Sequence, residues 1–593
     1  MNQAEAADTS MFARRTVFAV LFSITFVGPL WLAAVALAPG GFGLLDLAAL
    51  VLFAVTLPWM AAGFANAVIG FVIMRFSADP VVAVLPAAGL VGDDQPVTAS
   101  TAILLCVRNE PPRRIVRNLD TMLEGLHASG YGERFHLYLL SDTSDADLAV
   151  AEEALFSELI ARWRDRIAID YRRRTVNTGF KAGNVREFCE RWGSRHEFAV
   201  TLDADSFMSA DAIIRLVRIM QVDVRLGILQ GLIVGLPSTS LFARIFQFGM
   251  RLGMRSYTIG SAWWQSDCGP YWGHNAILRL EPFMKHCQLP LLSGSGETER
   301  HILSHDQIEA VLMRAAGYHV RVLPREDLGW EENPPTLLEF MRRDLRWCQG
   351  NMQYWRFLLL PKLRPVSRYQ LVLAILMFIG SPAWIGLLVL ATIALVTNDD
   401  PAMIVRADAG GALLTWVLAM WFSPKIAGAL DVLLSRQERR AFGGAGRFTV
   451  NLVIETVYSI ILVPILWISH TIFLFGLLFN REIRWMGQVR DDHAVPLTLA
   501  LQDLWPQTLV GCASLGLVLA SQPSALPYVL LLAGGPALSV PFAMVTAWPA
   551  IGELAARLGI GRIPEETDIP EDLLELALPA IKSESQPPLT NSV

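Results

Sequence analysis

The sequence is poor in charge and lacks patterned cysteine. Only 18% of its 593 residues are charged whereas 53% are hydrophobic, which is too apolar for an ordinary soluble multidomain enzyme. Its six cysteines show no CxxC spacing, which fits neither a disulfide framework nor a zinc site and favours isolated reduced thiols. The net charge is −6 and the central basic residues are mixed with acids, so nothing indicates nucleic-acid binding.

Long apolar runs stand at the two ends of the chain, around a polar middle. Residues 16–38 and 44–74 follow Arg14 and Arg15 without a nearby cleavage site, which predicts a signal anchor and a return span. Because basic flanks stay in the cytoplasm, we expect two transmembrane helices over 1–75 and a cytoplasmic domain over 76–368.

Further apolar runs predict a second membrane region over 369–556. Residues 448–479 contain Pro464 and have basic segments on both flanks. We expect this run to turn back as a kinked hairpin or re-entrant pair, with one tilted span plus an interfacial helix as the alternative. The tail, 557–593, is predicted to be cytoplasmic and partly disordered because it is rich in Pro, Ser and Asn.

Apolar strands alternate with helical stretches in the polar middle. Residues 102–107 and 135–140 read as buried strands, each followed by a helical segment, 112–127 and 152–164. This order predicts a doubly wound α/β sheet. In such sheets ligands bind at the carboxyl ends of the strands, and the acidic residues that fall at those ends are Glu110 and Asp142.

Two carboxylates, Asp203 and Asp205, follow a third buried strand over 198–202. One can contact a sugar or ribose while the other holds Mg²⁺, which prefers few carboxylates together with phosphate oxygens. A solvated turn is the alternative. Upstream, glycines flank Lys181, which permits close approach of the backbone to a nucleotide; a plain turn capping a helix from about Val185 explains the same pattern.

Three downstream segments carry further candidate residues. Trp272, His274 and Asn275 lie in a stretch of aromatics, glycines and small polar residues, the mixture that sugar-binding grooves need. Asp306 begins a predicted helix, where the helix dipole favours a carboxylate. The segment 342–347 places two arginines, Arg343 and Arg346, one helical turn apart, with Trp347 beside them. The alternative is an amphipathic helix that lies at the membrane surface.

The ordered set of these motifs between membrane spans resembles the processive glycosyltransferases of family 2, such as cellulose and hyaluronan synthases. Within them, Ser304-His305-Asp306 and residues 343–351 (RDLRWCQGN) and 481–491 (REIRWMGQVRD) resemble the glucan biosynthesis glucosyltransferase H family, the osmoregulated periplasmic glucan synthases. The chain departs from the cellulose- and hyaluronan-type synthases at two places, since those enzymes usually carry Thr-Glu-Asp where it has Ser304-His305-Asp306 and Gln where it has Arg343.

The resemblance implies a membrane α-helical bundle with a cytoplasmic GT-A domain, UDP-glucose as donor and a β-1,2-linked glucan made by inversion. It assigns the general base to Asp306, a divalent cation (Mg²⁺ or Mn²⁺) to Asp205 and acceptor stacking to Trp347. We expect the acceptor groove to include Trp272, His274 and Asn275. The donor-binding residues it implies are Glu110, Asp142, Lys181, Asp203, Arg343 and Arg346.

The same resemblance implies a bacterial inner-membrane location, with membrane lipids and the growing glucan as partners. Acyl carrier protein and a periplasmic glucan-processing protein are further candidate partners that no residue identifies. We expect the spans to line a sugar-wide export path, gated by residues 485–488. The alternatives are a cellulose- or hyaluronan-type synthase and a transporter or scaffold with a decayed transferase domain; the retained motif residues argue against decay.

Overall fold

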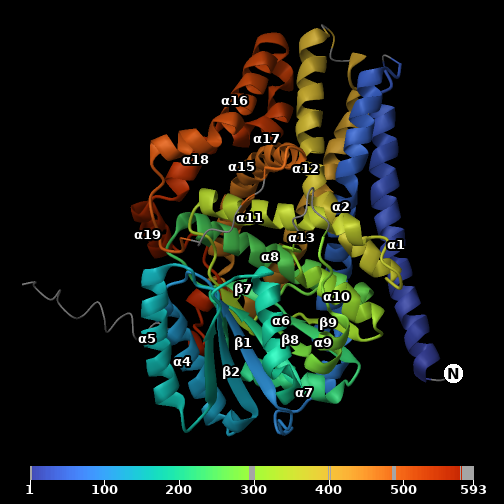
Figure 1. Cartoon of the computed structure of the whole chain (residues 1–593). Coiled ribbons are helices and arrows are strands. Elements are labelled where there is room, and N and C mark those ends of the chain that lie inside the picture. The colour runs from blue at the N-terminus through green and yellow to red at the C-terminus, as the bar shows by residue number, and fades with distance from the viewer. Residues whose placement is uncertain are drawn as a thin grey trace, which may run out of the picture. The chain divides into compact units, whose positions relative to one another are not determined.

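The computed structural model describes residues 3–39, 41–292, 301–398, 400, 403–481, 483, 489–574 and 576. The chain divides into two compact units, one helical and one built on a β-sheet (Figure 1). The helical unit consists of Met1–Val84, Ser238–Ser266 and Asn333–Arg562, and the sheet unit of Leu85–Pro237, Asp267–Glu332 and Ile563–Val593. The predicted boundaries at 75 and 368 differ from this division, because two helices from the polar middle pack among the long apolar helices.

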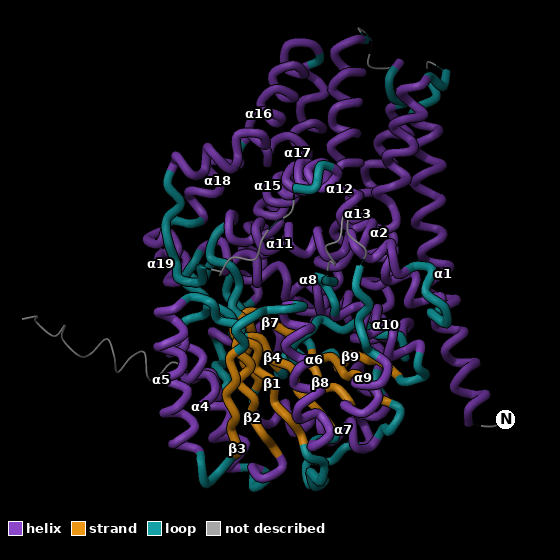
Figure 2. Tube along the Cα trace, viewed as in Figure 1, coloured by secondary structure: helices purple, strands orange, loops and turns teal. Residues whose placement is uncertain are grey.

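The sheet unit is built on a mixed sheet of seven strands, with the order β3-β2-β1-β4-β8-β6-β9 (Figure 2). Only β8 runs antiparallel to its neighbours, and every residue of β2 except one is fully buried, as a strand covered on both faces requires. The strands are β1 (Thr101–Val107), β2 (Phe135–Ser141), β3 (Ala168–Arg173), β4 (Phe198–Asp203), β6 (Leu226–Gly231), β8 (Ala276–Arg279) and β9 (His319–Leu323).

A second, three-stranded sheet extends this unit beside the end of β4. It has the order β5-β10-β7. Its strands are β5 (Ser206–Met208), β7 (Ile233–Gly235) and β10 (Gly329–Glu331). The helices of the unit are α4 (Pro112–Ala128), α5 (Ala146–Trp163), α6 (Phe180–Trp192), α7 (Ala210–Val222), α9 (Leu280–His286) and α10 (Asp306–Ala315). The predicted doubly wound sheet is confirmed.

Three local predictions in this unit were wrong. Helix α5 begins six residues before the predicted start at 152, because Asp145 caps it by accepting from two backbone N–H groups. Strand β3 was not predicted, since its charged and partly exposed residues mask the apolar pattern. Helix α6 begins at Phe180 rather than near Val185, so Lys181 lies in its first turn.

The helical unit contains, among its described residues, six helices that are long and apolar enough to cross a membrane. The protein is therefore a multi-pass membrane protein, as predicted. These helices are α1 (Gln3–Ala36), α2 (Leu44–Phe76), α12 (Pro365–Thr397), α13 (Ala407–Leu434), α15 (Ala445–Leu478) and α16 (Leu497–Ser521). The shorter helices are α3 (Pro80–Val84), α8 (Leu241–Gln265), α11 (Leu337–Met352), α14 (Arg436–Ala441), α17 (Leu526–Ala537), α18 (Ser539–Thr546) and α19 (Pro549–Leu558).

The hairpin predicted for 448–479 is wrong, because α15 is one continuous helix through Pro464. A proline in a membrane helix is tolerated where neighbouring helices satisfy the freed carbonyl, and Pro464 is buried inside the bundle. At 34 residues, α15 rises about 50 Å, which exceeds the hydrocarbon core of roughly 30 Å. One span that extends beyond the membrane or tilts accounts for the whole run.

The last two predicted elements also differ in detail. The run 527–548 forms not one helix but α17 and α18, which meet at a bend of 57°. Residues 564–566 in the tail form a short 3-10 helix, and Glu565 is buried, so the disorder predicted for the tail does not include them. Residues 577–593 lie outside the described residues.

Helices α2 and α8 approach each other through two glycines. A Cβ at Gly70 of α2 would overlap the backbone carbonyl of Ser256, and a Cβ at Gly260 of α8 would overlap that of Asn66. Small residues at such contacts let helix backbones come close together in a membrane. The glycine pair therefore sets the spacing of α8 against the membrane helix α2.

This close approach predicts that Gly70→Val destabilises the helical unit, because the added methyl groups collide with backbone that has no rotamer to change. We expect a loss of about 1–3 kcal/mol or more, read as a lower thermal midpoint of the purified full chain in detergent. Gly63→Val is the matched control, since a Cβ at Gly63 of the same helix meets nothing within 4 Å. Equal midpoints for the two variants would contradict the packing role.

Candidate active site

The candidate site lies at the carboxyl ends of β1, β2 and β4 in the sheet unit. Glu110 is buried in the loop after β1, and Asp142 follows β2 directly. The two loops are joined by Asn109, whose side-chain oxygen accepts from the backbone N–H groups of Ser144 (2.9 Å) and Asp145 (3.1 Å). Glu110 and Asp142 thus lie at the edge of the sheet where the sequence places them.

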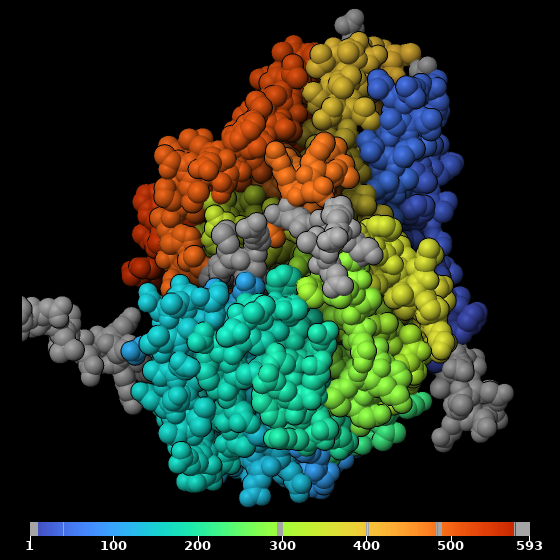
Figure 3. Space-filling model, viewed as in Figure 1, coloured from blue at the N-terminus to red at the C-terminus, as the bar shows by residue number. Residues whose placement is uncertain are grey.

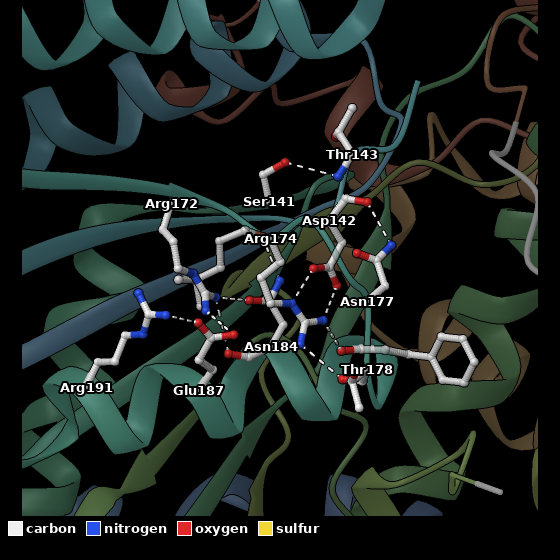
Figure 4. Close-up of polar contacts among 12 residues, drawn as sticks. Ser141, Asp142, Thr143, Arg172, Arg174, Asn177, Thr178, Asn184, Glu187 and Arg191 are labelled. Atoms are coloured by element: carbon white, nitrogen blue, oxygen red, sulfur yellow. Dashed lines mark hydrogen bonds and ion pairs between the residues drawn. The ribbon is translucent and has the colours of Figure 1, made fainter. Parts of the chain in front are cut away.

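A buried ion pair organises the first part of this site (Figure 4). The Arg174 guanidinium donates through Nε and Nη2 to the two carboxylate oxygens of Asp142, each at 2.6 Å, and both side chains are only 6% exposed. Arg174 also donates to the backbone carbonyls of Thr178 (3.0 Å) and Phe180 (2.9 Å). One side chain therefore ties the ends of β2 and β3 to the loop that starts α6.

Arg174 is a residue that sequence reasoning missed. The available signal was its position at the end of a run of three arginines that closes β3. The other members of that run differ: Arg172 forms an ion pair with Glu187 at 2.8 Å, whereas Arg173 is exposed. Only the fold distinguishes the arginine that holds Asp142.

The loop before α6 takes a conformation that its glycines permit. Gly179 has φ of 73°, in the left-handed region that glycine enters at no steric cost. A Cβ at Gly183 would overlap the carbonyl oxygen of Thr178, so the first turn of the helix closes tightly on the loop. This geometry aims Lys181 back toward the end of β4.

Lys181 forms a direct ion pair with Asp203. Burial by itself would lower the pKa of the ammonium group, but its neighbours, with Asp203 foremost and Cys106 and Asp306 adding to it, together outweigh burial and raise the pKa of Lys181. The lysine therefore stays charged. Sequence reasoning assigned both residues to donor binding, and the structure brings their side chains together.

Asp306 lies in the same cluster, at the first residue of α10. A Cβ placed on Gly273 would lie 3.7 Å from the Asp306 carboxylate oxygen Oδ2 and 3.8 Å from Nζ of Lys181. Gly273 has φ of 82°, a left-handed conformation that explains why a glycine stands there. The structure thus gathers Asp203, Lys181 and Asp306 around one glycine.

The segment after Gly273 is held by a residue that sequence reasoning missed, Gln230. Its side-chain oxygen accepts from the backbone N–H of Trp272 at 2.8 Å, and its side-chain amide donates to the backbone carbonyl of His274 at 2.9 Å. A polar residue inside the apolar strand β6 was the signal. Trp272 remains partly exposed, so it retains a face for a ligand.

His274 and Asn275 differ in what they offer a ligand. The His274 ring is partly exposed and contacts the Ser206 hydroxyl at 3.1 Å through Nδ1. Asn275 is fully buried, and its backbone donates to Thr201 and accepts from Gly231. Its contact with the acceptor stays a prediction.

Asp205 lies in the turn that joins β4 to β5 and is partly exposed. No group of three or more His, Cys, Asp and Glu side chains placed to hold a metal occurs in the part of the chain that the structure describes. A cation at Asp205 would draw its other ligands from phosphate oxygens and water. Mg²⁺ accepts that donor set readily, so the residues present fit it.

Arg343, Arg346 and Trp347 lie on α11, which belongs to the helical unit. Arg343 is buried, and its guanidinium carbon lies 4.9 Å from the centre of the Trp347 ring, a cation–π geometry. Between them in sequence, Asp344 contacts Nε2 of His470 at 2.5 Å. Residues 485–488, the predicted gate, lie outside the described residues.

A second buried pair stands next to Asp306. Nδ1 of His305 lies 3.0 Å from Glu309 Oε2, and both side chains are buried. Burial alone would lower the pKa of His305, but the carboxylates of Glu309 and Asp306 together outweigh burial and raise that pKa. The residue that precedes the predicted base is therefore held in place by an acidic partner one turn along α10.

Two family models match the chain. Residues 198–548 match "Glycosyl transferase family group 2" and residues 102–287 match "Glycosyl transferase family 2". The second range covers the strands that carry Glu110, Asp142 and Asp203. The first range includes Asp306 and the whole of α11.

The chain is also similar to curated proteins named "Glucans biosynthesis glucosyltransferase H". One from Pseudomonas paraeruginosa is 34% identical over 540 residues, 88% of this chain and 62% of the relative. One from Pseudomonas putida is 33% identical over 562 residues, 92% of this chain and 64% of the relative. The chain therefore spans a little under two thirds of the length of these relatives.

Among solved structures, the chain is similar to the mannosyltransferase PcManGT from Pyrobaculum calidifontis, in complex with GDP-Man and Mn²⁺. The sequence identity is 16% and the TM-score 0.36, with 63% of this chain and 98% of that chain covered. A likeness of this size supports no statement about ligands or site residues.

The Arg174 pair predicts a large cost for its removal. Arg174→Gln leaves the Asp142 carboxylate buried without its cation, which costs about 3–5 kcal/mol. We expect a clearly lower thermal midpoint for the purified full chain. Arg173→Gln, at the exposed position immediately before Arg174, is the control and should change stability by less than about 0.5 kcal/mol. Equal effects would show that the pair does not organise the loop.

The His305 pair predicts a pH dependence of stability. Because the folded chain holds the His305 proton more tightly than the unfolded chain, this contribution is complete below about pH 6.5 and is lost as pH rises through the folded pKa. The thermal midpoint of the wild-type chain should therefore fall as pH rises above that value. His305→Gln should make this fall less steep. The control, His127→Gln at an exposed site, should keep the wild-type profile, and an unchanged slope in the first variant would contradict the pairing.

Proposed function

Because the chain belongs to glycosyl transferase family group 2, we propose that it transfers glucose from UDP-glucose to a growing glucan, with inversion at the anomeric carbon and β-1,2 linkage. That it is a membrane glycosyltransferase follows from its family and its apolar helices. The donor, the linkage and the processive addition of glucose are the proposed part. The observation that carries the proposal is the cluster of Asp306, Lys181 and Asp203 around Gly273.

In the proposed reaction, Asp306 is the general base. An acceptor hydroxyl attacks the anomeric carbon, a new glycosidic C–O bond forms, and the bond to the UDP oxygen breaks. The hydroxyl proton passes to the Asp306 carboxylate, which must lie within hydrogen-bond reach of the acceptor, and UDP leaves with the electron pair. A single in-line displacement of this kind inverts the configuration.

The donor is bound by groups at the same edge of the sheet. Glu110 and Asp142 are proposed to hold the uracil and ribose, and Arg174 keeps Asp142 in place. Asp203 contacts the ribose or donor sugar, with Lys181 beside it. Mg²⁺ or Mn²⁺ bound by Asp205 would neutralise charge that develops on the diphosphate.

The roles proposed for α11 rest on its motif. Arg343 and Arg346 offer guanidinium groups of the kind that bind diphosphate oxygens in pairs. Trp347 is 47% exposed, which leaves a ring face for stacking on a terminal acceptor sugar. His274, Trp272 and Asn275 remain proposed acceptor contacts, of which Asn275 is buried.

The proposed location is the bacterial inner membrane, with the sheet unit in the cytoplasm, where nucleotide sugars are made. Arg14 and Arg15 before the first span support this orientation. We also propose that the spans export the glucan, because aromatic side chains lie among them. The rings of Trp384, Trp421 and Trp467, on three different spans, stack with centroid distances of 5.1–5.4 Å. Acyl carrier protein and a periplasmic processing protein stay predictions from the family resemblance.

The experiment that tests the proposal is linkage analysis of glucan made by the purified full chain from UDP-glucose and Mg²⁺. We expect β-1,2-linked glucose, one UDP released per residue added, and loss of activity on chelation of the metal. Another linkage or another UDP-sugar would favour the cellulose- or hyaluronan-type alternative. No transfer from any UDP-sugar would favour a transporter or scaffold.

A matched pair of variants isolates the base. Asp306→Asn should lower the rate of UDP release by about 10²–10⁴-fold without unfolding the chain. Asp211→Asn is the control, because Asp211 occupies the first turn of α7 and is exposed. Normal UDP release by Asp306→Asn would refute the assignment. In sealed vesicles whose cytoplasmic face is turned inward, release of all the glucan inside the lumen would refute export.

A further inference from the structure

A short segment of the helical unit combines exposed apolar side chains with a group of exposed cationic side chains. It runs from the 3-10 helix η4 (Gln353–Phe357) to the first turn of α12. Leu359 is 91% exposed and Trp355 62% exposed. The segment is yellow in Figure 3, where yellow atoms form part of the visible surface. Large apolar side chains exposed in this way mark a contact with a partner or a membrane.

Inward-facing residues hold this segment in a defined shape. Tyr354, Phe357 and Leu363 are buried, so Trp355 and Leu359 face outward as a consequence of folding. At the start of α12, Arg368 donates from Nε to the carbonyl of Leu358 at 3.2 Å and from Nη2 to that of Leu360 at 3.5 Å. The turn that carries Leu359 is therefore fastened to the helix that follows.

The exposed side chains around this turn are cationic. Arg356, Lys362, Arg364 and Arg368 are all exposed, and the Arg356 guanidinium lies 5.5 Å from the centre of the Trp355 ring. No Asp or Glu occurs in the sequence between Asp344 and Asp399. The surface thus carries positive charge without acidic side chains from its own stretch of chain.

The position of the segment identifies its partner. It leads directly into α12, whose residues from Pro365 onward are apolar enough to span a membrane, so Trp355 and Leu359 stand where the chain enters the bilayer. Tryptophan prefers the headgroup region of membranes, and clustered Lys and Arg at the end of a span attract anionic lipids. A soluble protein partner would not require this continuity with a span.

We propose that residues 353–368 form a binding surface for anionic phospholipids, with Trp355 and Leu359 inserted at the headgroup level. Arg356, Lys362 and Arg364 contact lipid phosphates, while Arg368 mainly holds the turn. This surface is independent of the reaction proposed above, because it needs neither donor nor acceptor. Its position immediately after α11 also anchors the end of that helix to the membrane surface.

The test measures contact of Trp355 with lipid in nanodiscs that contain the full chain. Fluorescence of wild type minus that of Trp355→Phe isolates the signal of Trp355. Two nanodisc preparations have the same mixture of phosphatidylglycerol and phosphatidylcholine, with bromine on the chains of only one of the two lipids. We expect quenching of Trp355 to be about twofold stronger when phosphatidylglycerol carries the bromine, and the excess to fall with added salt.

Charge variants, each made with and without Trp355→Phe, complete the test. The triple variant Arg356→Gln, Lys362→Gln, Arg364→Gln should remove the excess quenching by brominated phosphatidylglycerol, while Arg368 preserves the turn. The control removes three exposed arginines of the sheet unit, Arg162→Gln, Arg186→Gln and Arg225→Gln, and should keep the excess. The proposal is overturned if Trp355 is not quenched or if the two brominated lipids quench it equally. It is also overturned if the control variant loses as much of the excess quenching as the triple variant. Glucosyltransfer is not measured, so failure here leaves the proposed function untouched.

Discussion

The candidate site depends on one buried ion pair, between Arg174 and Asp142. Burying two charges is costly unless every donor and acceptor is used, and Arg174 meets that condition by also bonding to the carbonyls of Thr178 and Phe180. These bonds hold the loop that begins α6. That helix in turn directs Lys181 to Asp203, so the end of β2, the end of β3 and the end of β4 are connected through a single guanidinium.

Backbone contacts bring the reacting groups together as much as side chains do. Gly183 lets the first turn of α6 close on its loop, and Gly273 lets the chain pass beside Asp306 and Lys181 in a left-handed conformation. A side chain at Gly183 would collide with the Thr178 carbonyl, and one at Gly273 would strain the backbone at its φ of 82°. The cluster that carries the proposed chemistry is therefore built on two places where only glycine fits.

In the helical unit, buried charge is also paired. Lys425 of α13 binds Glu455 of α15 at 2.6 Å, and His470 of α15 lies between Asp344 of α11 and Ser381 of α12. Ionisable groups inside a membrane are expensive unless they meet such partners. The contact through Asp344 fastens α11 to two membrane helices, so the helix that carries Arg343 and Trp347 is positioned by the spans themselves.

The sequence by itself determined most of the membrane spans, the strands β1, β2 and β4, and the acidic residues at the ends of those strands. These features depend on apolar length, on local pattern and on motif. The sequence did not determine that Arg174 rather than Arg173 holds Asp142, that Asn275 is buried, or that α15 passes straight through Pro464. Only the tertiary structure decided these points. Each depends on contacts between segments far apart in the chain, and such contacts leave no periodic signal in the residues that make them.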